Sequence, residues 1–241
     1  MIRIDDLNIN IMVEGQGDVM LILHGWGCDS SLLMPIMEYF KKKYQVIIMD
    51  LPGFGKSDTP HTIWKIDDYV SLLESVLSYY NIKTAPLILA HSFGARIALA
   101  FALKHQVKAM ILSGAAGIKD HHHLSYYLKV FHYKLAKKLH LSYAARMGSE
   151  DYLKSEGVLR DILVRVIHED ISKDLNKISC PTLLVWGNKD EQTPLWMGKK
   201  MEKQMPNAKL VVFQGDDHFA YFHQMRRFLE VCDCFLIGQK L

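Results

Sequence analysis

A serine lies between an apolar run and a helix-compatible stretch, with a small residue two places before it and another two places after it. Ser92 follows the run 86–89 and precedes the segment 95–103, and the flanking small residues are Ala90 and Gly94. When a strand turns sharply into a helix, only small side chains fit at these two positions, and the strained turn holds the serine hydroxyl out at the strand end. The pattern predicts that Ser92 is a nucleophile, if the chain also supplies a base and an acid.

A serine hydroxyl needs a base within hydrogen-bond reach, and the base needs an acid to orient it. Of the 12 histidines, His218 stands in a loop between the last expected strand and the final helix, where a side chain can reach an active-site edge. His91 is expected to point away from its neighbour Ser92. His24 ends a strand, where it is expected to pack the following loop, and it is also kept as a candidate substrate contact. His218 is therefore the predicted base.

The acid should follow another strand end. Asp190 follows the expected strand 182–186 by four residues, in a turn closed by Pro194. Ser92, Asp190 and then His218 also give the order Ser, Asp, His along the chain. Asp120 is the alternative acid, although it lies far from the strand expected to end at Leu112.

A tetrahedral intermediate carries an oxyanion, which needs two preorganised donors. The backbone N–H of Phe93, directly after the serine, is one candidate. The second is the backbone N–H of Trp26, because Gly25 and Gly27 on either side let the backbone approach a substrate closely.

Composition narrows the class of protein. The chain has 241 residues, 49% of them hydrophobic, and a net charge of +3, which is too small to indicate nucleic-acid or membrane partners. Acidic residues near the N-terminus do not fit a signal peptide, and no apolar run approaches the ~18 residues of a membrane span. The four cysteines show neither metal-type spacing nor a disulfide framework. We expect a soluble cytoplasmic protein.

Short apolar runs alternate with amphipathic helical stretches, which predicts a largely parallel sheet covered by helices on both faces. The runs 9–13 and 19–23 are expected to pair as a hairpin, and the periodicity of 66–80 predicts a helix. Segment 115–177 contains no convincing strand. It is interpreted as a helical insertion over the carboxyl edge of the sheet, with ordinary sheet-covering helices as the alternative.

These motifs together resemble the α/β-hydrolase superfamily. The loop 24–27, the glycine-rich segment 50–57, the turn around Ser92, the Asp190 turn and the His218 loop occur in the order found in that family. The resemblance covers nearly the whole chain apart from the insertion. It implies a mostly parallel eight-stranded sheet flanked by helices, with the second strand antiparallel and a helical lid inserted after the sixth strand. The core would then be 1–114 and 178–241, and the lid 115–177.

The same resemblance implies a serine hydrolase that cleaves a carboxylic ester, thioester or lactone of a small to medium acyl substrate, without cofactor or metal. Ser92 would form an acyl-enzyme, with His218 as base and Asp190 as orienting acid. Within the superfamily the chain resembles pimeloyl-carrier-protein methyl esterases, enol-lactonases and carbon–carbon bond hydrolases. Two alternatives remain: a ligand-binding or receptor protein with little turnover, and a carbon–carbon bond hydrolase or lyase that uses the same three residues.

The substrate must be read from the insertion, which carries no motif. Tyr126, Tyr127 and Phe131 are candidates for lining an acyl pocket, although they could equally pack the lid. Arg160 could anchor an anionic substrate or form a surface ion pair. Residues 119–148 hold six Lys or Arg against one acid, which suits an acidic carrier protein; a solvated helix face is the alternative.

Overall fold

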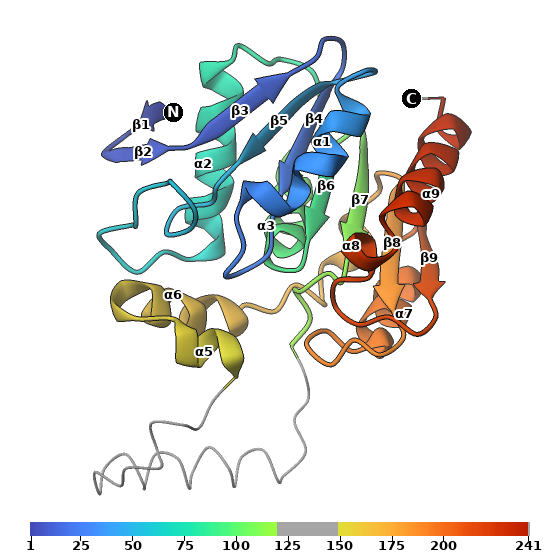
Figure 1. The fold of residues 1–241 in the computed structure, drawn as a ribbon. Coiled ribbons are helices and arrows are strands. Elements are labelled where there is room, and N and C mark those ends of the chain that lie inside the picture. Colours follow the sequence, from blue (N-terminus) through green and yellow to red (C-terminus); the bar gives the residue numbers. More distant parts are fainter. Residues whose placement is uncertain (120–148, 241) are drawn as a thin grey trace, which may run out of the picture.

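A seven-stranded sheet forms the centre of the molecule in a computed structural model that describes residues 1–119 and 149–240 (Figure 1). Its strand order is β3-β5-β4-β6-β7-β8-β9, and every neighbouring pair is parallel except β3 with β5. The strands are β3 (Ile11–Glu14), β4 (Val19–Leu23), β5 (Gln45–Met49), β6 (Leu87–His91), β7 (Ala109–Ser113), β8 (Thr182–Gly187) and β9 (Ala208–Phe213). The prediction of a mostly parallel α/β sheet is confirmed.

Helices cover both faces of this sheet, because its strands alternate apolar side chains between two separate cores. One core joins the sheet to α2, α3, α6 and α7, and the other joins it to α1, α8 and α9. The helices are α1 (Met34–Phe40), α2 (Ile66–Tyr79), α3 (Phe93–Ala102), α5 (Glu150–Lys154), α6 (Gly157–Ile167), α7 (Leu195–Gln204), α8 (Ala220–His223) and α9 (Met225–Gly238), with short 3-10 turns η1 (Ser30–Leu33) and η3 (Leu175–Lys177). The helix predicted over 66–80 is confirmed as α2.

The number of strands in the sheet differs from the eight that the family resemblance implied. The first two strands, β1 (Ile2–Ile4) and β2 (Leu7–Ile9), pair only with each other. They stay apart because a loop bonds the other edge of β2: Asn8 N donates to Asp58 Oδ2 at 2.8 Å, and Asp58 N donates to Asn8 O at 2.9 Å. The insertion consequently follows β7, which is the fifth strand of this sheet in chain order and not the sixth.

The expected hairpin of 9–13 with 19–23 is also wrong. β5 lies between β3 and β4, antiparallel to the first and parallel to the second. All five residues of β4 are buried, so this strand needs a neighbour on each side, and it finds them in β5 and β6. In the predicted hairpin, β3 would take the place beside β4 that β5 occupies.

The described part of the predicted insertion contains the helices α5 and α6, which lie together beyond the end of the sheet (Figure 1). A buried arginine on α3 fastens α6 to the core. Arg96 Nη1 donates to Val166 O at 2.6 Å and also to Glu169 O, which satisfies carbonyls at the C-terminal end of α6. Burial lowers the pKa of Arg96 to about 10. The boundaries 115 and 177 stay a prediction, since residues 120–148 lie outside the described part.

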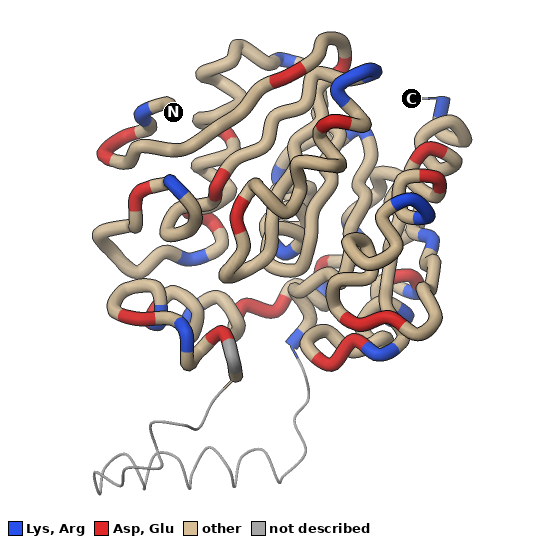
Figure 2. Tube along the Cα trace, viewed as in Figure 1, with Lys and Arg blue, Asp and Glu red and all other residues tan. Residues whose placement is uncertain are grey.

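Charge is distributed over the described trace without segregation of sign: acidic and basic residues are interspersed along it (Figure 2). The basic stretch 119–148 lies outside the described residues except for Lys119. Within residues 1–119 and 149–240, no helix combines the length and the hydropathy needed to cross a bilayer.

A buried carboxylate holds the loops beside the C-terminal ends of the strands and makes the stability of the fold depend on pH. Asp50 accepts hydrogen bonds from Ser30 N at 2.7 Å, Lys56 N at 2.9 Å and Asn10 Nδ2 at 2.8 Å. Burial alone would raise the pKa of Asp50, but these hydrogen bonds outweigh burial and leave that pKa below its ordinary value. Its ionised form therefore stabilises the fold above the ordinary Asp pKa, and this stabilisation is lost as the pH falls through the lowered value.

We expect Asp50→Asn to lower the free energy of unfolding by about 1–3 kcal/mol at pH 7, because an amide cannot accept from all of these donors. The difference from wild type should shrink on acidification, as the wild-type carboxyl becomes protonated. Urea unfolding midpoints at pH 7 and at a series of pH values from about 4 down to about 2 measure it, because the loss is expected below the ordinary Asp pKa. A difference that does not change with pH would contradict this account of Asp50.

Candidate active site

The turn between β6 and α3 holds Ser92 in a strained backbone conformation. Its φ is +49° and its ψ is −108°, a region that residues with a side chain rarely occupy. Backbone bonds hold this turn, since Ser92 N donates to Ser113 O at 3.0 Å and Ser92 O accepts from Arg96 N at 3.1 Å. A Cβ added to Gly94 would lie 2.6 Å from His24 O, so only glycine fits two places after the serine. Strain held by its surroundings is typical of functional positions.

Asp190 and His218 meet at the same edge from the loops after β8 and β9. His218 Nδ1 donates to Asp190 Oδ2 at 2.8 Å, and both side chains are almost entirely buried. The other carboxylate oxygen, Oδ1, accepts from the backbone N–H groups of Gln192 and Thr193 at 3.0 and 2.8 Å. Among the described residues His218 Nε2 has no hydrogen-bond partner. A histidine oriented in this way can take up a proton at Nε2 while its cation is stabilised at Nδ1.

Gly114, directly after β7, lies against this pair. Its φ is +51°, and a Cβ built on it would lie 3.0 Å from His218 Nδ1 and 3.2 Å from Asp190 Oδ2. A methyl group there would press on the hydrogen bond between the two side chains. We therefore expect Gly114→Ala to lower kcat about 10–100-fold, because displacing the two side chains by up to about 1 Å would lower the rate by as much as roughly 100-fold.

The matched control for this prediction is Gly157→Ala. Gly157 has a similar φ of +54°, and a Cβ on it would meet no described atom within 4 Å. Both variants carry the backbone penalty of roughly 1–2 kcal/mol for an L-residue at positive φ, but only Gly114→Ala should affect turnover. Steady-state kinetics with unfolding midpoints for both variants test this; equal kcat values would contradict it.

The two candidate oxyanion donors lie in adjoining segments. α3 begins at Phe93, so the N–H of this residue is one of the helix donors without an intrahelical acceptor. A Cβ on Gly25 would lie 3.3 Å from Ser92 Cβ, which shows how closely the loop after β4 approaches the serine. In that loop the Trp26 ring packs edge-to-face on Phe93 at 5.1 Å between centroids, and its Nε1 donates to Ser155 Oγ at 3.1 Å. The loop is thereby tied to the end of α5.

His24 lies in the loop scaffold with both ring nitrogens engaged. Nδ1 donates to Gly25 O at 2.7 Å, and Nε2 accepts from Leu51 N at 2.8 Å. Burial lowers the pKa of His24, which favours the neutral ring that this pattern requires. This arrangement leaves His24 no polar atom for a substrate and fits the expected loop-packing role.

The His91 ring packs against the ring of the predicted base, His218. Its ring centroid is 4.6 Å from that of His218 and 4.7 Å from that of Tyr221, and Nδ1 donates to Ser113 O at 3.0 Å. Burial, with a further contribution from the nearby His218, lowers the pKa of His91 well below its ordinary value. A neutral ring therefore packs against the side of His218. No pattern in the sequence pointed to this contact, because it joins residues far apart in the chain.

Of the remaining candidate site residues, Arg160 is described by the structure and four are not. Arg160 Nε donates to Ser155 O at 2.8 Å, and its guanidinium lies 5.2 Å from the centroid of the Tyr152 ring. This side chain thus stabilises the C-terminal end of α5. Tyr126, Tyr127, Phe131 and the alternative acid Asp120 lie outside the described residues.

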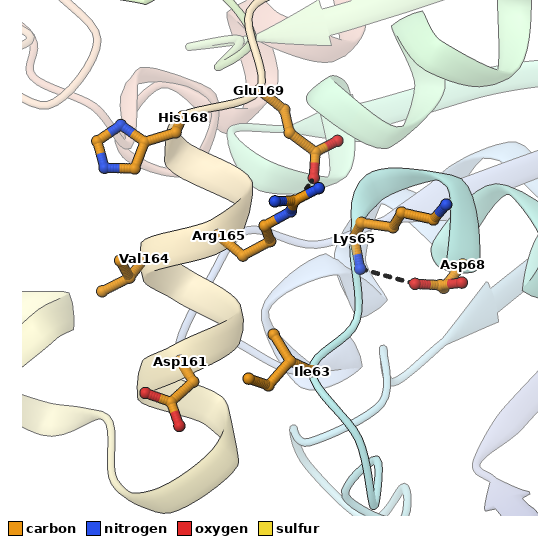
Figure 3. A pocket seen from close by; sticks show the side chains of 8 residues that line it. All are labelled: Ile63, Lys65, Asp68, Asp161, Val164, Arg165, His168 and Glu169. Carbon is orange, nitrogen blue, oxygen red and sulfur yellow. Dashed lines mark hydrogen bonds and ion pairs between the residues drawn. The ribbon is translucent and has the colours of Figure 1, made fainter.

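A separate cleft of about 820 Å³ opens between α6 and the segment that enters α2 (Figure 3). Arg165 points from α6 toward Glu169, with 3.6 Å between Nε and Oε1, and Lys65 N donates to Asp68 Oδ2 at 2.7 Å. Ser92, Asp190 and His218 do not line this cleft. Residues 1–119 and 149–240 also contain no group of three or more His, Cys, Asp or Glu side chains that could hold a metal ion.

Comparison with protein families gives one match over most of the chain. The model described as "Alpha/beta hydrolase family" matches residues 20–231, which contain all the candidate residues named above.

Among curated proteins, a pimeloyl-[acyl-carrier protein] methyl ester esterase of Legionella pneumophila is 27% identical over 252 residues. The alignment covers 95% of this chain and all of that protein. A 2-hydroxy-6-oxononadienedioate/2-hydroxy-6-oxononatrienedioate hydrolase of Paraburkholderia phymatum is 28% identical and covers 96% of this chain and 91% of that one. Among solved structures, a thermophilic esterase from Thermogutta terrifontis matches with a TM-score of 0.77 at 19% identity, over 97% of this chain and 94% of that chain. At that identity the likeness supports the fold.

Proposed function

Because the chain belongs to the alpha/beta hydrolase family, we propose that it is a serine hydrolase that cleaves a carboxylic ester through an acyl-enzyme on Ser92. The observation that carries this proposal is the buried bond of 2.8 Å between His218 Nδ1 and Asp190 Oδ2, at the same sheet edge as the strained Ser92 turn. This bond leaves Nε2 as the basic nitrogen of the neutral ring, which is the atom that a serine nucleophile requires.

The proposed reaction proceeds in two stages. Ser92 Oγ attacks the carbonyl carbon while His218 Nε2 takes the hydroxyl proton, and Asp190 stabilises the imidazolium. The N–H groups of Trp26 and Phe93 donate to the oxyanion. Collapse of the intermediate expels the alcohol, which receives its proton from Nε2. A water molecule activated by His218 then attacks the acyl-enzyme and releases the acid.

We also propose the substrate class. The Legionella relative is named for a methyl ester of an acyl group carried by a protein, which supports a small to medium acyl ester, and thioesters and lactones share its chemistry. The six basic residues of 119–148 support an acidic carrier protein as the body that presents the acyl group. In this proposal segment 115–177 is the lid that bounds the acyl pocket.

A second candidate is supported by the Paraburkholderia relative, which is named as a hydrolase of a dienedioate. The same three side chains could serve a carbon–carbon bond hydrolase or lyase, since fold does not decide the reaction. A receptor with little turnover is the third alternative.

A panel of substrates separates these candidates. We expect measurable hydrolysis of p-nitrophenyl acetate and butyrate and of dimethyl pimelate, all abolished in Ser92→Ala. Cleavage of a 2-hydroxy-6-oxo-dienoate without ester turnover would favour the carbon–carbon hydrolase. Wild type as inactive as Ser92→Ala on every substrate would favour the receptor.

A further inference from the structure

One hydroxyl lies at the centre of the acid–base pair and has no role in the reaction described above. Thr193 is buried, and its Oγ1 lies 2.9 Å from Asp190 Oδ2, 3.0 Å from Gly114 O and 3.3 Å from His218 Nδ1. The backbone N–H of Thr193 donates separately to Asp190 Oδ1 at 2.8 Å. This residue thus contacts both carboxylate oxygens, one through its side chain and the other through its backbone.

The single hydroxyl proton has two acceptors within reach, the carboxylate of Asp190 and the carbonyl of Gly114. Hydrogen bonds to an ionised acceptor are roughly twice as strong as neutral ones. The proton therefore favours Asp190 Oδ2, the same atom that accepts from His218 Nδ1.

We propose that Thr193 is a positioning residue for the acid–base pair: its hydroxyl fixes the Asp190 carboxylate with Oδ2 facing His218 and so sets the orientation of the histidine ring. The inference rests on the proposed function, because it concerns the same site. Thr193 touches neither substrate nor the attacking oxygen in this account, and it acts entirely through Asp190.

Removing the hydroxyl has two consequences. Oδ2 keeps the bond from His218 but loses its second donor, so the carboxylate is held less tightly in the orientation that faces the imidazole. Its charge is also less dispersed, which strengthens its attraction to the imidazolium. The looser orientation should lower turnover, and the stronger attraction to the imidazolium should move the acidic limb of the kcat/KM profile to higher pH. Of the described residues, Asp190 and His91 place titratable groups against the His218 ring, and His91 stays neutral over this range because burial lowers its pKa well below the ordinary value.

The test compares Thr193→Val, which keeps shape and backbone, with Thr193→Ser, which keeps the hydroxyl. We expect Thr193→Val to lower kcat about tenfold with little change in KM, roughly the factor for one hydrogen bond to a charged group. Thr193→Ser should stay within about threefold of wild type. In an Asp190→Asn background Thr193→Val should have no further effect on kcat, because the hydroxyl acts through the carboxylate.

Unfolding midpoints are recorded for each variant, and if Thr193→Val does not fold, Thr193→Ala carries the same expectation without added apolar bulk. A folded valine or alanine variant with wild-type kcat and pH profile overturns the inference while leaving the proposed function intact. An additive effect in the Asp190→Asn background overturns it too, since Thr193 would then act by another route. Wild type without ester turnover overturns both the proposed function and this inference.

Discussion

Replacing Ser92 with alanine is expected to lower kcat for ester substrates by about 10⁴–10⁶-fold, the range found when the nucleophile of such a site is removed. The substitution keeps the Cβ and the backbone strain, because alanine at a φ of +49° meets the same steric limits as serine. Turnover is therefore lost with the nucleophilic oxygen and not with the fold. The measurement is steady-state hydrolysis of p-nitrophenyl butyrate, with the unfolding midpoint as a check on folding.

Ser113→Ala is the matched control for this variant. Ser113 is a buried serine at the end of the next strand, its carbonyl accepts from Ser92 N, and its own Oγ has no hydrogen-bond partner among the described residues. Removing its hydroxyl should change kcat by no more than a few-fold. If Ser113→Ala were as damaging as Ser92→Ala, or if Ser92→Ala retained a tenth of the activity, the assignment of Ser92 would be wrong.

Asp190→Asn should have the second largest effect, a fall in kcat of about 10⁴-fold. The carboxylate accepts hydrogen bonds on both oxygens, from His218, Thr193 and Gln192. An amide must turn its NH₂ group toward some of these donors, and facing His218 it would favour the ring tautomer that carries its proton on Nε2. A histidine in that tautomer cannot accept the serine proton.

The comparator is Asp120→Asn, the alternative acid from the sequence. We expect that variant to keep kcat within a few-fold of wild type, measured in the same assay. The opposite pattern, with Asp190→Asn active and Asp120→Asn inactive, would transfer the role of the acid to Asp120.

Local patterns predicted much of this architecture. Apolar residues recur with the period of each element, and this periodicity predicts the strands at 19–23 and 45–49 and the helix at 66–80. The turn at Ser92 is also predicted from a local pattern, since a tight strand-to-helix turn admits only small flanking residues. Each of these signals lies within a few consecutive residues.

The errors and omissions concern contacts between distant segments. The predicted hairpin is wrong because β5 lies between β3 and β4. The eighth strand is missing from the sheet because the loop at Asp58 occupies the free edge of β2. Gly114 and Thr193 were not identified, because their importance comes from where β7 and β8 end relative to each other. Their residue types are ordinary at a strand end and in a turn, so no local pattern marks them.

Covalent labelling tests the central claim most directly. A fluorophosphonate ester reacts with an activated serine and leaves a phosphonyl group of known mass on its oxygen. After incubation of wild type, intact mass spectrometry should show one adduct per chain, and peptide mapping should place it on Ser92. Ser92→Ala should remain unlabelled, and Asp190→Asn should label far more slowly. An adduct on another residue, or ester hydrolysis by a chain that never becomes labelled, would contradict the assignment of Ser92 as nucleophile.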